Sequence, residues 1–256
     1  MEGPRFVTGK PALMAGDSLV IADLHLGIER EFRKSGIRFP SQTGRIRDRI
    51  DRLIEETRPE RLIFLGDVKH KVPGISLQEA REIPGFLKHF SDRLEVGIVP
   101  GNHDAGIEKY APRAVKIHPA TGIGVDGIFL NHGHAWPDPG FLRCGTIVLG
   151  HQHPMVEFKD KLMYRFVEPV WIRCRLSRAK LEERYKAVPR AMPEAVIMPA
   201  FNEIAGGIAM NSSQRSDSLD DYIGPLLRSV DKKTASAHML DGTFLGKLMD
   251  LRDAKL

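Results

Sequence analysis

The sequence has 256 residues, enough for a single domain with a sizeable hydrophobic core. Hydrophobic residues make up 42% of it and charged residues 28%, proportions typical of a globular protein, which argues against long disorder or a fibrous repeat. The formal net charge of +5 makes the surface mildly basic and favours polyanionic partners such as nucleic acid.

The chain contains no segment expected to cross a membrane, because no apolar run approaches the roughly 20 residues that a spanning helix requires. The N-terminal residues Met-Glu-Gly-Pro-Arg also lack the basic and then apolar layout of a secretory signal. We therefore expect a cytoplasmic protein without a membrane partner. The two cysteines, Cys144 and Cys174, are expected to be reduced thiols in such a compartment.

Five short apolar runs predict buried β-strands, because each is too short for a helix and is rich in Ile, Val, Leu or Phe. They cover residues 18–22, 61–65, 94–99, 127–131 and 146–149. A helix is predicted between the first two runs, where Ile46, Ile50, Leu53 and Ile54 form one apolar stripe that ends before Pro59. A second helix is predicted over residues 78–90. This alternation of strands and helices predicts a parallel sheet.

After residue 114 the pattern changes to glycine-punctuated runs, which predict hairpins and antiparallel strands, including residues 163–167 and 170–175. Residues 177–194 are charged and partly helical in pattern, and residues 195–198 and 243–245 are strand-like. Residues 206–231 are rich in Gly, Ser and Asp and are predicted to be a long surface excursion. Each half would then supply one sheet of a two-sheet sandwich within a single α/β domain, residues 1–256.

Five polar segments directly follow the five predicted strands. They are Asp23-Leu24-His25, Gly66-Asp67, Gly101-Asn102-His103-Asp104, Asn131-His132-Gly133-His134 and Gly150-His151-Gln152-His153, and they hold six of the ten histidines. Loops at the carboxyl ends of parallel strands share one edge of a sheet, so these segments are expected to converge. One His-x-His pair or one Gly-Asp turn would be weak evidence, but five such coincidences indicate a functional site.

The side chains in these segments are carboxylates, imidazoles and a carboxamide, without a thiolate. This ligand set suits divalent ions such as Mn, Fe, Zn, Ni or Co, whereas structural zinc sites usually contain cysteine. In Asp23-x-His25 and His151-x-His153 the spacing of two puts both side chains on the same side of an extended segment. The sequence therefore predicts a metal centre.

In their order and spacing, these motifs resemble the calcineurin-like metallophosphoesterase superfamily over about residues 18 to 153. Within it, residues 21–27, 36–40 and 66–70 and the run Pro199-Ala200-Phe201-Asn202-Glu203 look like the archaeal SbcD-related and the bacterial DNA-ligase-associated phosphoesterases. The resemblance implies a four-layer α/β/β/α sandwich of two mixed sheets, with two divalent metal ions at one edge, most often Mn. It also implies a hydrolase of phosphate esters.

The resemblance implies two sets of metal ligands that share Asp67. Asp23, His25, Asp67 and His153 would hold one ion, and Asp67, Asn102, His132 and His151 would hold the other. Two cations at roughly 3.5 to 4 Å can share a water and lower its pKa, so that a bridging hydroxide attacks the phosphate. The leaving oxygen then needs a proton donor, for which His103 is the candidate, with Asp104 holding its ring.

Three further residues are assigned supporting or substrate-binding roles. His134 is the alternative to His132 as a ligand and would otherwise stand behind it, His70 would orient a ligand or lie in a turn, and Arg38 would contact substrate. Residues 30–52 contain eight arginines and lysines, which could line a phosphodiester or could simply form a solvated helical face. His89, His118 and His238 need no function.

The sequence supports three functions. The first is a phosphodiesterase or nuclease acting on nucleic acid or on nucleotide diesters, and the second is a small-molecule phosphomonoesterase. The third is a catalytically silent module that docks a DNA-repair or RNA-processing partner through residues 206–231. Preference for a diester over a monoester substrate would favour the first, and absence of bound metal would favour the third. The sequence does not indicate an oligomeric partner.

Overall fold

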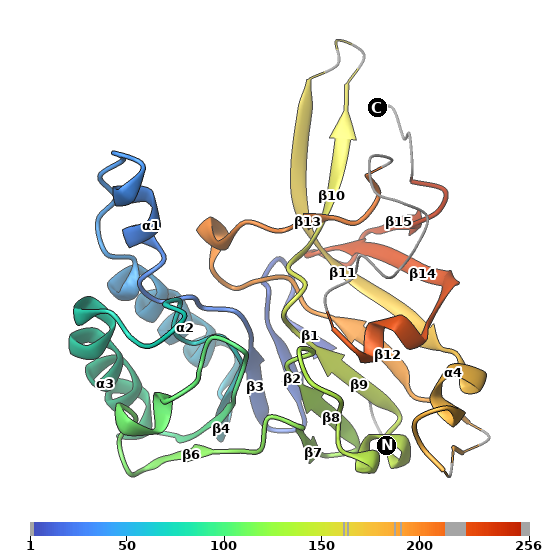
Figure 1. The fold of residues 1–256 in the computed structure, drawn as a ribbon, viewed down its shortest axis with the longest axis horizontal. Helices are drawn as coiled ribbons and strands as arrows, with labels where there is room; N and C mark the ends of the chain where they lie inside the picture. Colours follow the sequence, from blue (N-terminus) through green and yellow to red (C-terminus); the bar gives the residue numbers. More distant parts are fainter. Residues whose placement is uncertain are drawn as a thin grey trace.

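The structure is a computed structural model that describes residues 3–160, 162, 164–186, 188–189, 191–212 and 224–251. Two β-sheets face each other, and the helices of the N-terminal half cover the outer side of the first sheet (Figure 1). This arrangement confirms the predicted α/β sandwich of two mixed sheets. None of the described helices has the length and apolar character needed to cross a membrane.

The first sheet has the strand order β1-β2-β3-β4-β5-β6. The strands β3 to β6 run parallel, and β1 and β2 extend the sheet in antiparallel fashion. Strands β1 and β2 were not predicted from the sequence. The bounds are β1 Arg5–Phe6, β2 Leu13–Ala15, β3 Ser18–Ile21, β4 Arg61–Leu65, β5 Glu95–Val99 and β6 Val115–Ile117.

The second sheet has the order β13-β10-β11-β12-β9-β8-β7, and β14 pairs with both β11 and β15. Residues 165–176 form one long strand where two shorter ones were predicted, and Met163 lies outside the described residues. The bounds are β7 Ile123–Val125, β8 Ile128–Asn131, β9 Thr146–Leu149, β10 Pro154–Lys159, β11 Arg165–Leu176, β12 Glu194–Ile197, β13 Ile208–Ala209, β14 Val230–Met239 and β15 Phe244–Lys247.

Helices cover the outer faces of the two sheets unequally. Helices α2 and α3 pack on the first sheet, whereas the second sheet is covered by short elements around Phe141, Leu181 and Leu226. The helices are α1 Glu29–Lys34, α2 Thr43–Thr57, α3 Leu77–Ser91 and α4 Arg178–Glu182, and the 3₁₀ turns are η1 Ile107–Lys109, η2 Pro139–Arg143, η3 Glu203–Ala205 and η5 Leu226–Ser229.

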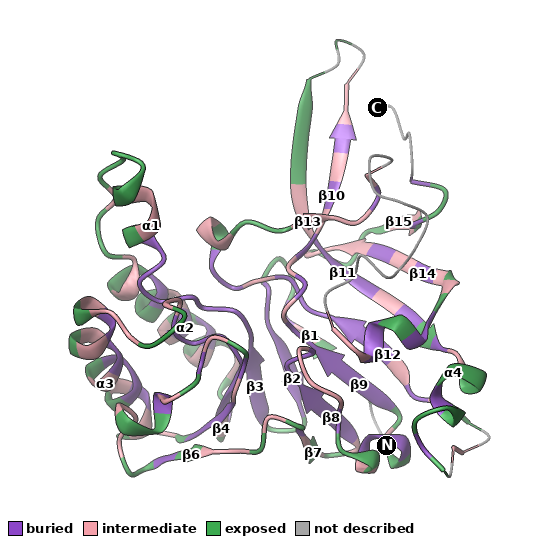
Figure 2. Ribbon diagram, viewed as in Figure 1, coloured by how far each residue is buried: buried purple, intermediate pink, exposed green. Residues whose placement is uncertain are grey.

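The central strands are buried on both faces, which explains their unbroken apolar runs (Figure 2). On β4, Ile63 and Leu65 pack between the sheets, whereas Leu62 and Phe64 pack under the helices. The same alternation divides β9, because Val148 faces the first sheet. Side chains of a strand point alternately to its two faces, so each of these short strands contributes to two hydrophobic layers.

The two long helices begin and end where local signals place them. Helix α2 ends at Thr57, and Arg58 takes the left-handed conformation at φ 48° before Pro59. Helix α3 begins with a capping box, in which the Ser76 side chain accepts from the N–H of Glu79 and the Glu79 side chain accepts from the N–H of Ser76.

Parts of residues 206–231, predicted to be a surface excursion, pack on the second sheet. Strand β13 pairs with β10, and Leu226 and Leu227 of η5 are buried against the second sheet. The first residues of β14 also fall in this segment. Its composition gave no strong strand signal, because β13 has only two residues and the start of β14 is polar. Residues 213–223 lie outside the described residues.

Candidate metal centre

The loops that follow β3, β4, β5, β8 and β9 meet at one edge of the sandwich, because neighbouring strands run parallel within each sheet. Backbone hydrogen bonds join these loops. The N–H of Asp23 donates to the carbonyl of Gly66 at 3.1 Å, and that of His25 donates to the carbonyl of Asp67 at 2.8 Å. Across the sandwich, the N–H of His151 donates to the Asp23 carboxylate at 3.0 Å.

Five of the predicted ligands have a backbone conformation that L-amino acids rarely adopt. Such conformations cost about 1–3 kcal/mol each and persist where the surrounding structure holds them, as at many functional sites. Only two further non-glycine residues among the described ones have a positive φ. The five are Asp23 (φ 59°), His25 (φ 43°), Asp67 (φ 50°), His151 (φ 71°) and His153 (φ 42°).

Two glycines allow the loops to approach each other closely. A Cβ atom on Gly101 would lie 2.0 Å from Oδ1 of Asp67 and 2.5 Å from its backbone nitrogen. A Cβ atom on Gly66, which has φ 79°, would lie 2.2 Å from Cδ2 of His132. Glycine is therefore required at both positions, because any side chain there would displace a predicted ligand.

Substitution Gly101→Ala should weaken metal binding by about 10- to 100-fold, since the added methyl group would push Asp67 out of place. Calorimetric titration of the metal-free protein with Mn²⁺ measures this loss. The matched control is Gly85→Ala on α3, where an added Cβ atom meets nothing within 4 Å. That control should bind Mn²⁺ normally and gain about 0.5–1 kcal/mol of stability. Equal affinity in the two variants would contradict the packing argument.

The first group of candidate ligand atoms comes from Asp23, His25 and His153, and these atoms lie within 4.8 Å of one another. Nε2 of His153 lies 3.3 Å from Oδ1 of Asp23 and 3.3 Å from Nε2 of His25. Oδ2 of Asp67 lies 3.6 Å from Nε2 of His25. The four residues that the sequence assigns to one metal ion are thus brought together.

The second group comes from Asp67, His132 and His151, again within 4.8 Å. Nε2 of His132 lies 3.7 Å from Oδ2 of Asp67 and 2.9 Å from Oδ1 of Asp23. Nε2 of His151 is buried and has no hydrogen-bond partner among the described residues. A buried polar atom without a partner is costly, and a bound cation would remove that cost. Asp67 borders both groups, as a bridging carboxylate must.

The charges of this centre are arranged for cation binding. Burial lowers the pKa of His25 to about 2 and that of His151 to about 3, so both rings are neutral and keep a lone pair for a metal. Burial opposes ionisation of Asp23, but the facing His153 and His132 outweigh it and hold the pKa of Asp23 well below its usual range. Burial raises the pKa of Asp67 to about 6, although His132 opposes this effect.

Asn102 and His103 lie on the loop that closes over Asp67. The N–H of His103 donates to Oδ1 of Asp67 at 2.9 Å, and Nε2 of His103 lies 3.9 Å from Oδ2 of the same residue. The His103 side chain is 24% exposed and therefore reachable from solvent. Asn102 is exposed, the least buried of the seven predicted ligands. His103 is thus positioned to meet a substrate that approaches the carboxylate from outside.

Asp104 differs from its predicted role. Its buried carboxylate accepts the N–H of Gly101 at 2.8 Å and the N–H of Lys69 at 3.2 Å, both backbone groups. These bonds hold the loops after β4 and β5 against each other. The His103 ring is held instead through Nδ1, which donates to the carbonyl of His70. Asp104 therefore positions the backbone around Asp67, where the sequence had predicted contact with the His103 ring.

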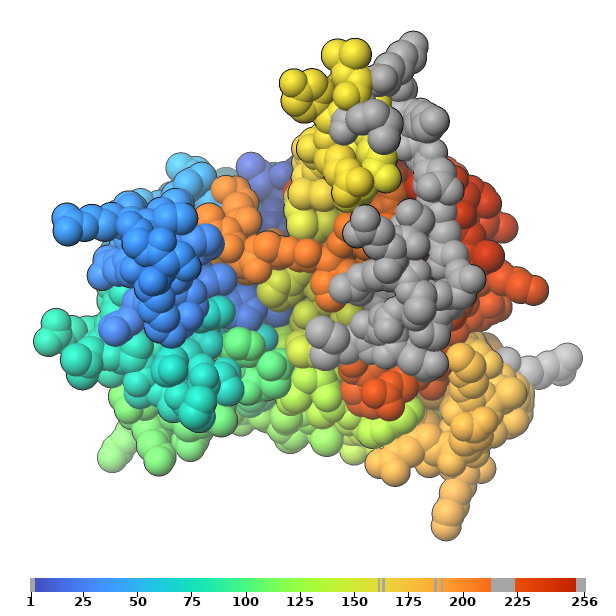
Figure 3. Space-filling model, turned by 45° about the horizontal axis from the view of Figure 1, so that its top comes forward, coloured from blue at the N-terminus to red at the C-terminus, as the bar shows by residue number. Residues whose placement is uncertain are grey.

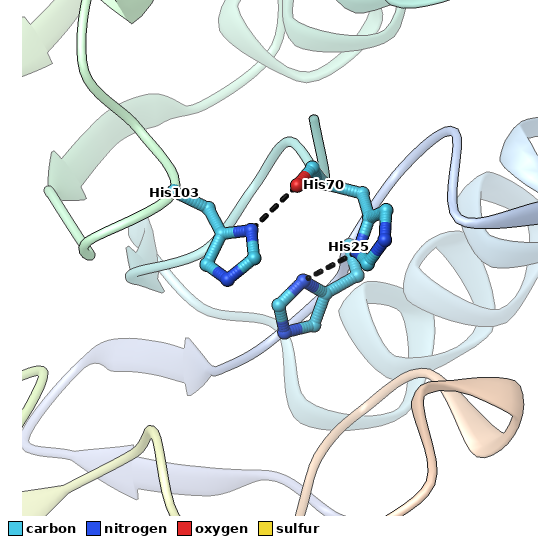
Figure 4. Close-up of side chains that lie close together, drawn as sticks. All are labelled: His25, His70 and His103. Carbon is cyan, nitrogen blue, oxygen red and sulfur yellow. Dashed lines mark hydrogen bonds between the residues drawn. The ribbon is translucent and has the colours of Figure 1, made fainter. Parts of the chain in front are cut away.

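His70 contacts two of the predicted site residues (Figure 4). Nδ1 of its ring lies 3.3 Å from Nδ1 of His25, and its carbonyl oxygen accepts from the His103 ring. His25, His70 and His103 also satisfy the distances of a metal-ligand group. However, Nε2 of His25 faces Asp67, so its Nδ1–H is free to donate to His70. This geometry suits a supporting role for His70, because the second ring nitrogen of a metal-bound histidine usually donates to an acceptor.

The two alternatives at the fourth motif lie at different depths. His132 is completely buried and faces Asp23, whereas Nδ1 of His134 contacts Nδ1 of His132 at 3.1 Å from behind. Burial lowers the pKa of His134 to about 4, so its ring is a neutral acceptor. This geometry favours His132 as the ligand. Arg38 is exposed in the loop after α1, and none of the hydrogen bonds or ion pairs of the centre involves it.

Sequence reasoning missed three residues that support the centre. Lys69 is buried, and its Nζ donates to the carbonyls of Lys71 and Gly74, which fixes the turn that carries His70. The Glu79 carboxylate accepts the N–H of His70 at 2.9 Å. Nδ2 of Asn202 donates to the carbonyl of Leu24 at 2.7 Å. The capping-box spacing of Ser76 and Glu79 was visible in the sequence, but the contacts with the metal loops were not.

Comparison with known proteins agrees with this geometry. Residues 18–169, more than half of the chain, match the model of the calcineurin-like phosphoesterase family, and the chain belongs to that family. Its members hydrolyse phosphate esters with divalent metals, and the carboxylates and imidazoles brought together here fit such ions. No curated protein matches significantly. The narrower resemblance to SbcD-related and ligase-associated enzymes stays a prediction.

Two solved structures are similar in fold. The nuclease MPE of Pseudomonas putida has 18% sequence identity and a TM-score of 0.55, over 93% of this chain and 98% of that one. The phosphoesterase YfcE of E. coli has 15% identity and a TM-score of 0.39, over 90% of this chain and 96% of that one. At these identities the first likeness supports the fold alone.

Proposed function

We propose that this protein is a dinuclear metal-dependent phosphodiesterase that cleaves nucleic acid or nucleotide diesters. The observation that carries the proposal is the pair of ligand groups that meet at Asp67, one with His25 and one with His151. We assign Asp23, His25, Asp67 and His153 to one ion and Asp67, Asn102, His132 and His151 to the other. Mn²⁺ is the expected ion, and the expected compartment is the cytoplasm.

When bound, the two ions would supply Lewis-acid activation of water and of the phosphate group. The protein side chains supply the rest. Asp23 and Asp67 contribute only two negative charges, and the other ligands are neutral imidazoles and one amide, so the loaded centre keeps a positive excess that attracts an anionic ester. His103 reaches this centre from its exposed side and would donate a proton to the leaving oxygen. The carbonyl oxygen of His70 accepts from Nδ1 of His103 and would hold the His103 ring in place.

The preference for nucleic acid rests on charge and on likeness. The chain carries a net charge of +5, and basic residues are concentrated in α1, α2 and the loop between them. The Pseudomonas putida protein of similar fold is a nuclease. A phosphodiester backbone carries one negative charge per nucleotide, whereas many small phosphate esters carry no further anionic group. A basic surface beside the centre therefore favours nucleic acid as the substrate.

The test is hydrolysis of bis(p-nitrophenyl) phosphate and of p-nitrophenyl phosphate by the purified protein supplied with Mn²⁺, together with metal analysis. We expect two ions per chain and a preference for the diester. Activity on the monoester alone would establish the small-molecule phosphomonoesterase instead. Failure to bind any metal would establish the silent module. Without added Mn²⁺ the activity should be weak, because a site of neutral imidazoles can lose metal during purification.

A further inference from the structure

A pocket of about 680 Å³ opens beside the metal centre, and His153 is one of its lining residues. It lies between α2, the segment 200–206, the chain around Lys10 and the base of the β10–β11 hairpin. Figure 3 shows the segment around residues 200–210 (orange) lying between the α1–α2 region (blue) and the hairpin (yellow). Four cationic side chains and two carboxylates line the pocket, namely Lys10, Arg45, Arg49, Arg52, Glu56 and Glu203.

The three arginines come from one face of α2, at positions i, i+4 and i+7. At 1.5 Å per residue they span about 10 Å along the helix axis. Among the described residues, Arg52 and Lys10 have no ion-pair partner, whereas Arg45 and Arg49 each contact Glu203 at 3.2 Å. The Glu203 side chain is 61% exposed, and exposed ion pairs contribute little, so a phosphate can compete for both arginines.

One arginine is fixed in place before any ligand binds. The guanidinium of Arg49 lies 4.5 Å from the ring centroid of Phe201, and its side chain is only 19% exposed. Phe201 is itself tied to the first metal loop, because its N–H donates to the carbonyl of Ala22 at 2.9 Å. The arginine face of α2 is thus held in a set position relative to Asp23.

Beyond the pocket, the hairpin carries Lys159 and Arg165, whose charged groups lie 3.5 Å and 4.0 Å from the Glu157 carboxylate. In the antiparallel register, Met155 pairs with Pro169, Glu157 with Val167 and Lys159 with Arg165. Alternate residues of a strand share a face, so Lys159 and Arg165 lie on the same face as Met155, Val167 and Pro169, which line the pocket. The opposite face carries Phe158 and Phe166, stacked at 5.2 Å.

We propose that this pocket is the binding channel for one strand of nucleic acid, with the arginine face of α2 contacting phosphates on one side of the cleaved bond. The inference rests on the proposed function and specifies its substrate as a polynucleotide. The arginine face spans about 10 Å, long enough for more than one arginine to contact neighbouring phosphates of the same strand. A small diester would occupy only the metal centre and leave the channel empty.

The experiment compares the double variant Arg45→Gln/Arg52→Gln with the charge-matched control Arg47→Gln/Arg81→Gln, whose residues are exposed on α2 and α3 and do not line the pocket. Binding of fluorescent oligonucleotides of 2, 4, 8 and 12 residues is measured by anisotropy in EDTA, which prevents cleavage. Values of kcat/KM for the 12-residue strand and for bis(p-nitrophenyl) phosphate are measured with Mn²⁺.

We expect affinity of the parent protein to rise with length up to several nucleotides and then level off. The double variant Arg45→Gln/Arg52→Gln, here called the channel variant, should bind the 12-residue strand at least about tenfold more weakly than the control does. Its slope of log affinity against log salt should fall by about 1.4, or about 0.7 for each lost phosphate contact. Its loss in kcat/KM should be about tenfold larger on the oligonucleotide than on bis(p-nitrophenyl) phosphate.

Equal loss of oligonucleotide binding in the two double variants would overturn the channel and leave only general electrostatic attraction. Equally tight binding of poly-glutamate would also overturn it, since a channel for nucleic acid requires more than polyanion charge. If the parent hydrolyses diesters but the Arg45→Gln/Arg52→Gln variant binds oligonucleotides as tightly as the parent, the channel proposal is wrong and the proposed function stands. Conversely, if the parent binds oligonucleotides in a length-dependent way that the variant loses, and yet hydrolyses no diester, the channel proposal stands and the proposed activity is wrong.

Discussion

Substitution Asp67→Asn should slow metal-dependent hydrolysis by about 10³-fold and, at the same time, stabilise the metal-free protein at neutral pH. Asp67 borders both ligand groups, and its carboxylate is placed to bridge two cations. The amide offers one oxygen and no charge. A loss of about 4 kcal/mol in transition-state stabilisation, typical of removing metal assistance, corresponds to about 10³-fold in rate.

The effect on stability has the opposite sign in the absence of metal. Burial raises the pKa of Asp67 from 3.8 to about 6, so the ionised carboxylate is less favourable in the folded protein than in the unfolded chain. The stability gained from holding this proton is fully present below pH 3.8 and is lost as the pH rises through about 6. The amide avoids this loss and still accepts the N–H of His103.

Thermal denaturation at pH 7.5, with EDTA and with Mn²⁺, measures both effects. The parent should gain stability when Mn²⁺ is added, because the ions bind only the folded state. The variant should melt higher than the parent in EDTA and gain little from Mn²⁺. The control Asp92→Asn removes an exposed carboxylate that pairs with Lys88, and it should keep the full Mn²⁺ response. A full Mn²⁺ response in Asp67→Asn would contradict the bridging assignment.

Substitution His103→Ala should slow hydrolysis by about 10² to 10⁴-fold while both ions remain bound. The His103 ring contacts Asp67 only at 3.9 Å and from the exposed side, so its loss leaves the two ligand groups intact. The size of the loss should depend on the leaving group. An alkoxide leaving group requires a proton, whereas p-nitrophenolate is stable without one, so the loss should be large on DNA and small on bis(p-nitrophenyl) phosphate.

Steady-state kinetics on an oligonucleotide and on bis(p-nitrophenyl) phosphate, with metal analysis of the same samples, test this role. The matched control is His238→Ala, which removes a histidine from the pairing of β14 with β11 and β15, far along the sequence from every metal motif. This control should keep the activity of the parent on both substrates. Equal losses for His103→Ala on the two substrates would exclude proton donation, and loss of metal would make His103 a structural support of Asp67.

Much of the fold could be predicted from the sequence because it follows from local patterns. The strand β4 produces an unbroken apolar run and the helix α2 an apolar stripe, and both can be read within about 15 residues. The strands β13 and β14 could not be predicted so readily, because β13 has two residues and β14 begins with the polar run Asp231-Lys232-Lys233-Thr234. Their pairing with β10 and β11 depends on residues more than 50 positions away.

The sequence by itself determined which chemical groups were predicted for the centre and that they directly follow five apolar strands. The tertiary structure decided how these groups face each other. It turned His132 rather than His134 toward Asp23, across 109 residues of chain, and directed Asp104 to the backbone of Gly101 and Lys69. Strand and loop types depend on residues that are neighbours in the sequence. Side-chain contacts between the loops depend instead on how the two sheets, built from segments far apart in the sequence, pack on each other.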